Sequence, residues 1–211
     1  INQIPKGSVV VFSAHGVSQK VKNQAQSMTP AIYDATCPLV TKVHKEVVRR
    51  QKQNHQVILI GHDGHPEVEG TLGQSSDISS IFLVESIKAV ESLDYQPETS
   101  LSYTSQTTLS VDDTKLIVEA IETKFSWIQA PKKNDICYAT QNRQDSVKAI
   151  IEDAEVLIVI GSKNSSNSNR LREIAEKKQK PAYLIDRAND INSEWLIGVN
   201  SVGVTAGASA P

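Results

Sequence analysis

The sequence predicts an α/β protein built from repeated units with small, mostly parallel sheets, and three observations lead to this class. Apolar runs at 57–60 and 156–160 are typical of buried strands. Stretches with helical apolar spacing come before both runs, for example at Val40, Val43 and Val47. The same order of elements also recurs after about one hundred residues, which indicates duplicated units.

The repeat is visible in the spacing of matching positions. Cys37 precedes Gly61 by 24 positions, and Cys137 precedes Gly161 by 24 positions. The next predicted strands, 82–85 and 183–186, are one residue out of phase with this repeat. A last pair of strands with their following loops, 101–108 and 202–209, completes the two units.

The strand and loop at 9–16 resemble the end of another such unit, so we expect three units in the parent protein. Residues 1–33 would end the first unit, residues 34–115 form the second and residues 116–204 form the third. Residues 205–211 would begin a return segment to the first unit. Because the chain begins with Ile1 and stops at Pro211, we interpret it as a fragment and expect a further cysteine upstream.

Composition restricts the classes of partner. With 39% hydrophobic and 22% charged residues, no membrane-length apolar run and a formal charge of −2, the chain gives no reason to expect a nucleic-acid or membrane partner. The 2 cysteines are too few for a disulfide scaffold and suit a reducing, cytosolic setting. An anionic ligand would have to be held by local groups.

Cys37 and Cys137 open equivalent units. Two isolated cysteines are most often small buried hydrophobic residues. Their matching positions favour a shared role instead, because residues related by a repeat can converge on one axis. Three such thiolates would suit an iron-sulfur cluster, while zinc is the alternative metal.

Residues 61–70, GHDGHPEVEG, follow a strand, where open α/β sheets place ligand sites. His62, His65 and Glu67 can supply cations, donors and a proton-delivering carboxyl. The alternative is a solvated surface turn formed by Gly64 and Pro66.

Three further loops occupy matching positions in the three predicted units, each directly after a predicted strand. They contain His15, Thr107 and Ser209, and each precedes a predicted helix, whose N-terminal amides favour anions. Each loop alone is more often only a helix cap, but together they predict one central site.

The stretch at 160–171, IGSKNSSNSNRL, has the composition of a linker. Its register places it opposite the loop at 61–70 of the sister unit. Ser165, Ser166, Asn167 and Ser168 are then predicted to form a donor-rich loop ahead of a helix at 170–177, suited to a phosphate or diphosphate. The glycines match neither a P-loop nor a dinucleotide fingerprint.

Together these motifs resemble the 4-hydroxy-3-methylbut-2-enyl diphosphate reductases of the non-mevalonate isoprenoid pathway. The resemblance rests on residues 34–44, 61–70, 105–110, 135–143, 161–170 and 204–211, and so covers essentially the whole chain. It implies a three-lobed α/β protein of pseudo-threefold symmetry around a central 4Fe-4S cluster, with two complete units here. Three cysteines would hold the cluster, with Cys37 and Cys137 as the second and third, and the fourth iron would meet the substrate.

The resemblance also implies residue roles. Glu67 would donate a proton, assisted by Thr107, and His65 would lie near the substrate hydroxyl and diphosphate. His15, Ser165, Asn167 and Ser209 are expected to bind the diphosphate, with Ser166 close by. The full set of residues expected to bind the substrate is His15, His65, Thr107, Ser165, Ser166, Asn167 and Ser209.

The implied reaction is a two-electron reductive dehydroxylation of the allylic diphosphate to isopentenyl and dimethylallyl diphosphate. Flavodoxin or ferredoxin would supply the electrons in the bacterial cytoplasm. Three alternatives are a zinc hydrolase using Cys37, Cys137 and His65, a diphosphate-binding module, and a catalytically incomplete fragment.

Overall fold

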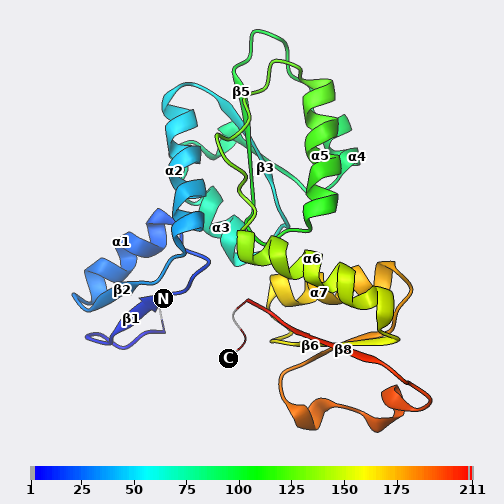
Figure 1. The fold of residues 1–211 in the computed structure, drawn as a ribbon. Helices are drawn as coiled ribbons and strands as arrows, with labels where there is room; N and C mark the ends of the chain where they lie inside the picture. The colour runs from blue at the N-terminus through cyan, green and yellow to red at the C-terminus, as the bar shows by residue number, and fades with distance from the viewer. Residues whose placement is uncertain (1–2, 209, 211) are drawn as a thin grey trace. The chain divides into compact units, whose positions relative to one another are not determined.

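The structure, a computed structural model, describes residues 3–208 and 210 and divides into two compact units. Ile1–Thr107 and Asp113–Asp135 form the first unit, and Thr108–Asp112 and Ile136–Pro211 form the second. Figure 1 shows small sheets flanked by helices in both units. In the sheets that the structure describes, every strand pairing is parallel, as the alternation of strands and helices predicts.

The first unit begins with a two-stranded sheet. Its elements are β1 (Val10–Phe12), α1 (Gln19–Met28) and β2 (Ile32–Asp34). Val10 and Phe12 face a small core with Ala25 of α1, whereas Val11 between them is exposed, so β1 alternates as a half-buried strand does. Ser18 caps α1 by accepting a hydrogen bond from the Val21 N–H.

The larger sheet of the first unit has the strand order β4-β3-β5. Its strands are β3 (Gln56–Ile60), β4 (Ile81–Val84) and β5 (Leu101–Ser105). The helices of this part are α2 (Pro38–Lys52), α3 (Pro66–Leu72), α4 (Ile87–Glu91) and α5 (Val111–Lys124), with a 3-10 turn at Ile78–Ser80. The central strand β3 is buried from Val57 to Ile60, which explains its uninterrupted apolar sequence.

Helices cover this sheet from two sides. Val47 of α2 packs with Val57 and Leu59 of β3. On the other side of the sheet lies α5 (Figure 1), whose Glu122 accepts a hydrogen bond of 2.8 Å from the Tyr103 hydroxyl of β5. These layers fix the carboxyl ends of β3 and β5, where Ile60 pairs with Ser105.

The second unit repeats the arrangement with the strand order β7-β6-β8. Its elements are α6 (Tyr138–Asp153), β6 (Val156–Ile160), α7 (Ser166–Lys177), β7 (Ala182–Ile185) and β8 (Val202–Ala206), with 3-10 turns at Ala188–Asp190 and Ser193–Leu196. Val147 and Ile151 of α6 and Leu171 of α7 share one core with Leu157 and Val159 of β6.

The predicted repeat is seen in the elements themselves. The central strands, β3 and β6, occupy 56–60 and 156–160, and the last strands, β5 and β8, occupy 101–105 and 202–206. The predicted boundary at 33/34 falls within β2 and the one at 115/116 within α5. The division into three repeated units therefore stays a prediction.

Candidate functional site

Glu67 and Thr107 meet where β3 and β5 end. Glu67 lies in the first turn of α3, and Thr107 follows β5 by two residues. The Thr107 N–H donates to Glu67 Oε1 at 2.6 Å, and the Thr107 hydroxyl donates to Oε2 at 3.1 Å. Only 2% of the Glu67 surface is exposed, so these two bonds hold a buried carboxyl group in one orientation.

Burial raises the pKa of Glu67 from 4.5 to about 7. The two hydrogen bonds from Thr107 oppose this rise because they stabilise the carboxylate, and the negative charge of Asp135 adds to it. A carboxyl group with a pKa near neutrality can hold a proton at physiological pH and release it to a substrate. The geometry therefore suits Glu67 to the role of general acid.

His65 caps the helix that carries Glu67. Its Nδ1 accepts a hydrogen bond of 3.1 Å from the Glu67 N–H, so the proton of a neutral ring lies on Nε2. The ring of His15 lies edge-on to that of His65, with 5.6 Å between the centroids and an interplanar angle of 82°. Both histidines are half-buried, and Ser13 Oγ lies 3.3 Å from His15 Nδ1.

Four of the predicted residues thus form one connected group in the first unit. His15 contacts His65, His65 bonds the backbone of Glu67, and Glu67 is bonded by Thr107. Three loops that lie far apart in the sequence are brought together by the two parallel sheets. The group combines imidazole donors, which suit a phosphate, with a protonatable carboxyl group.

In the second unit, the prediction of a donor loop at 165–168 is wrong in one respect. Helix α7 begins at Ser166 rather than near Arg170, so most of the predicted loop is helical. Ser165 is the N-cap residue, and Ser166, Asn167 and Ser168 form the first helical turn. Ser and Asn favour helix N-termini because their side chains bond to the unpaired N–H groups there. The stretch is therefore the positive end of a 12-residue helix, which is an anion-binding environment.

The side chains of this turn are interconnected. Ser165 Oγ accepts from Asn167 Nδ2 at 3.2 Å and from the Ser168 hydroxyl at 3.0 Å. Asn167 Oδ1 accepts from the Ala208 N–H at 3.0 Å, which ties the loop after β8 to α7. Ser166 Oγ lies 3.3 Å from the Thr108 hydroxyl.

Burial differs along the turn. Ser165 and Ser166 are half-buried, while Asn167 is 7% exposed. Close packing of the strand ends requires glycine here, since a Cβ at Gly161 or Gly207 would approach Ser168 Oγ to 2.3 or 2.1 Å. Ser209, predicted to bind the diphosphate, lies outside the described residues.

Cys37 and Cys137 occupy equivalent places. Each is the N-cap residue of a helix, α2 or α6, with similar backbone angles (φ −54°, ψ 135° and φ −62°, ψ 129°). Both are free, half-buried thiols whose side chains make no capping hydrogen bond. Within the described part of the chain, no group of three or more His, Cys, Asp or Glu side chains could hold a metal ion.

Asp135 is a residue whose importance the sequence did not reveal. It is 1% exposed and accepts hydrogen bonds from Lys42 Nζ at 2.6 Å, the Thr104 hydroxyl at 2.7 Å and the Ser105 N–H at 3.1 Å. Its position two residues before Cys137 was the available signal. Asp135 anchors the segment leading to this cysteine on α2 and β5.

The fold and these residues define a class of protein: a repeated α/β enzyme with a buried carboxyl group of raised pKa and with hydrogen-bond donors suited to an anionic group. Residues 1–211 match the family model described as LytB protein, and the chain belongs to this family. In the residues that the structure describes, no helix has the length and apolar character needed to cross a membrane.

Two curated relatives carry the same name, 4-hydroxy-3-methylbut-2-enyl diphosphate reductase. The relative from Ruthia magnifica is 63% identical over 211 residues, covering 100% of this chain and 68% of the relative. The relative from Pseudomonas aeruginosa is 54% identical over 213 residues, with the same coverage of 100% and 68%. The chain therefore spans about two thirds of the length of these relatives.

Two solved structures are also similar. The E-1-hydroxy-2-methyl-but-2-enyl-4-diphosphate reductase of Plasmodium falciparum has a TM-score of 0.93 at 37% identity, with 100% of this chain and 65% of that chain covered. A second structure, described as the terminal enzyme of the non-mevalonate pathway, has a TM-score of 0.64 at 33% identity, with coverage of 99% and 73%. These matches confirm the predicted family, the α/β fold and the predicted activity as a reductase.

Proposed function

We propose that the protein reductively removes the hydroxyl group of (E)-4-hydroxy-3-methylbut-2-enyl diphosphate, with a 4Fe-4S cluster as its cofactor. The products are isopentenyl and dimethylallyl diphosphate. One C–O bond breaks and one C–H bond forms, so each turnover consumes two electrons and two protons and releases one water. The observation that carries the proposal is the buried Glu67 carboxyl group, whose pKa is raised to about 7 beside Thr107.

Glu67 is the proposed source of the proton that leaves with the hydroxyl oxygen as water. Loss of hydroxide from an allylic carbon is unfavourable without protonation, and a carboxyl group that is protonated near pH 7 removes this obstacle. The Thr107 N–H and hydroxyl hold both carboxylate oxygens, so they orient the acid and stabilise it once its proton has gone.

The diphosphate is proposed to be bound by hydrogen-bond donors from both units. In the first unit these are the imidazoles of His15 and His65, which are already in ring contact. In the second unit they are Ser165, Ser166 and Asn167 with the N-terminal amides of α7. Ser209 is proposed for the same task, and His65 also for a position near the substrate hydroxyl.

The cluster is proposed to be held by Cys37, Cys137 and a third cysteine outside this chain. Thiolates are the usual ligands of iron-sulfur clusters, and the two cysteines fit because neither is in a disulfide and neither thiol caps its helix. When bound, such a cluster supplies electrons and a Lewis-acidic iron for the substrate oxygen. A flavodoxin or ferredoxin of the bacterial cytoplasm is the proposed electron donor.

The proposal is tested with full-length protein prepared without oxygen. We expect brown protein with about four iron and four sulfide per chain, and turnover of the allylic alcohol with reduced methyl viologen as the electron source. Replacing Cys37 or Cys137 by Ser should lower the iron content while circular dichroism stays unchanged. Colourless protein that is active with zinc would overturn the proposal.

A further inference from the structure

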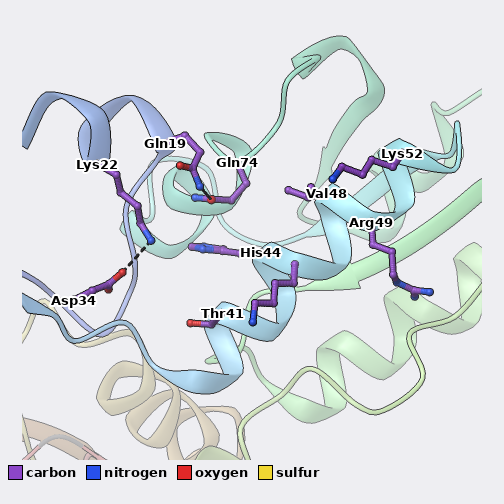
Figure 2. Close-up of a pocket in the computed structure, with 10 residues that line it drawn as sticks. Gln19, Lys22, Asp34, Thr41, His44, Val48, Arg49, Lys52 and Gln74 are labelled. Carbon is purple, nitrogen blue, oxygen red and sulfur yellow. Dashed lines mark hydrogen bonds and ion pairs between the residues drawn. The ribbon is translucent and has the colours of Figure 1, made fainter. Parts of the chain in front are cut away.

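A groove with a cationic lining lies beside helix α2 in the first unit. It has a volume of about 420 Å³. We call it the basic groove and define it by the residues Lys22, Asp34, Lys45, Arg49 and Lys52. Figure 2 shows Arg49 and Lys52 on α2, with Lys22 reaching across to Asp34.

The charge here contrasts with that of the whole chain, which is −2. Helix α2 carries the cations Lys42, Lys45, Arg49, Arg50 and Lys52 but only one acidic residue, Glu46. A second groove of about 310 Å³ shares Lys45 and Arg49 with the first and is also lined by Lys42. Arg50 is buried, so the exposed positive charge of this helix comes from Lys42, Lys45, Arg49 and Lys52.

Most of these cations have partners within the protein. Lys22 pairs with Asp34 at 2.9 Å, Lys42 with Asp135 at 2.6 Å, and both arginines with Glu46. Lys45 and Lys52, both exposed, have no ion-pair partner among the described residues. Arg49 is paired but its side chain is still 41% exposed.

Helix stability explains only part of this pattern. Arg49, Arg50 and Lys52 lie in the last turn of α2, where cations stabilise the negative end of the helix. Lys45 lies in the middle of the helix and gains nothing from that effect. His44 adds no charge to the groove, because burial and the charge of Lys22 lower its pKa to about 4.

The direction of α2 links this surface to the proposed cofactor. The helix starts directly after Cys37, a proposed cluster ligand, and Lys45 follows Cys37 by eight residues. Lys45 therefore lies about 12 Å along the helix axis from this cysteine. Lys52, at the far end of α2, lies about 22 Å along the axis from Cys37, so a carrier bound along this helix would be nearest the cluster at Lys45.

We propose that the basic groove and the exposed cations of α2 are the docking surface for an acidic electron-carrier protein. The inference rests on the proposed function, which requires an external source of two electrons. Each reduced carrier loses one electron to the enzyme and leaves, so two carriers dock in turn for each substrate. Exposed charges that act in this way accelerate association and are screened by salt, which suits a transient partner.

The spread of the cations favours a protein surface over a small anion. Lys45 and Lys52 are seven residues apart, or about 10 Å along the axis, whereas a phosphate is held by groups converging on one point. Lys45 and Arg49 also line two separate grooves rather than a single cavity.

The test compares two electron sources in the full-length holoenzyme. With reduced flavodoxin as the donor, the double variant Lys45→Glu/Lys52→Glu should raise KM for flavodoxin by about tenfold or more, because steering by charge is worth this much. With reduced methyl viologen, the same variant should keep the wild-type turnover. Raising the salt concentration should increase the KM of the wild type and narrow its difference from the variant.

The matched control is Lys88→Glu, an exposed cation on α4 that lines neither groove. It should leave KM for flavodoxin within about twofold of the wild type, since long-range charge is screened.

An unchanged KM for flavodoxin in the double variant would overturn the proposed docking surface. Loss of inorganic phosphate binding in that variant, with KM for flavodoxin retained, would also overturn it and indicate a small-anion site. Absence of viologen-driven turnover in the wild type would instead contradict the proposed function.

Discussion

Thr107 holds the buried carboxyl group of Glu67 at both oxygens, although 40 positions separate the two residues. The backbone contact of 2.6 Å does not depend on the identity of the Thr107 side chain, whereas the hydroxyl contact of 3.1 Å does. Burial favours the neutral acid and the two donors favour the carboxylate, so a pKa of about 7 is the balance of opposing effects.

Replacing Glu67 by Gln is expected to remove most of the turnover, because the amide fills the same space but has no proton to donate. General acid catalysis contributes about 10²–10⁴-fold, so a loss of that order should be measured with saturating substrate. The wild-type rate should fall as pH rises through about 7, the pKa of Glu67. Near-normal turnover in this variant, with cluster content unchanged, would contradict the proposed role.

Thr107→Val should raise the pKa of Glu67 further, since it removes the hydroxyl bond that stabilises the carboxylate and leaves the backbone bond in place. The descending limb of the pH–rate profile should move to higher pH. Thr107→Ser keeps a hydroxyl group and serves as the control. Its rate should fall at about the same pH as that of the wild type. If the rate of Thr107→Val falls at the same pH as that of the wild type, the Thr107 hydroxyl does not affect the pKa of Glu67.

The raised pKa of Glu67 also makes a prediction about stability. Below pH 4.5 the carboxyl group is protonated in both the folded and the unfolded chain, so its contribution is fully present. Between pH 4.5 and about 7 the unfolded chain ionises first, and the free energy of unfolding falls by about 3 kcal/mol as pH rises. The melting temperature of Glu67→Gln minus that of the wild type should therefore be larger at pH 8 than at pH 5. If the difference in melting temperature between variant and wild type is the same at both pH values, the pKa of Glu67 is not raised in the folded protein.

The sequence predicts strands better than it predicts contacts. The apolar runs at 57–60 and 156–160 coincide with β3 and β6, because strands buried on both faces leave an unbroken hydrophobic signal. The start of α7 was predicted too late, because Ser and Asn in a first helical turn have the composition of a loop. The bonds of Glu67 and Asp135 join distant segments, and no local pattern encodes such pairs.

Asn167→Ala is expected to weaken diphosphate binding by about tenfold, the effect of losing one good hydrogen bond to a charged group. The affinity of full-length protein for the substrate, measured by calorimetry without reductant, gives the result. Asn169→Ala is a suitable control, since in the described part of the chain its amide donates to the carbonyls of Lys163 and Ser165. Because Asn167 also accepts from the Ala208 N–H, both melting temperatures should be recorded. An unchanged dissociation constant would remove Asn167 from the proposed binding site.

Asp135→Ala should destabilise the first unit by about 3 kcal/mol, because two buried donors, the Thr104 hydroxyl and the Ser105 N–H, lose their acceptor. The change leaves Lys42 Nζ without its carboxylate at 2.6 Å and removes the acceptor of the Thr104 hydroxyl and the Ser105 N–H. Asp145→Ala is the matched control, because Asp145 is 56% exposed and lies 3.7 Å from Lys148, so its loss should cost less than about 1 kcal/mol. Urea unfolding of both variants measures the difference. Equal stability of Asp135→Ala and Asp145→Ala would show that the contacts of Asp135 do not anchor the segment before Cys137. The position of that cysteine would then depend on helix α6 alone.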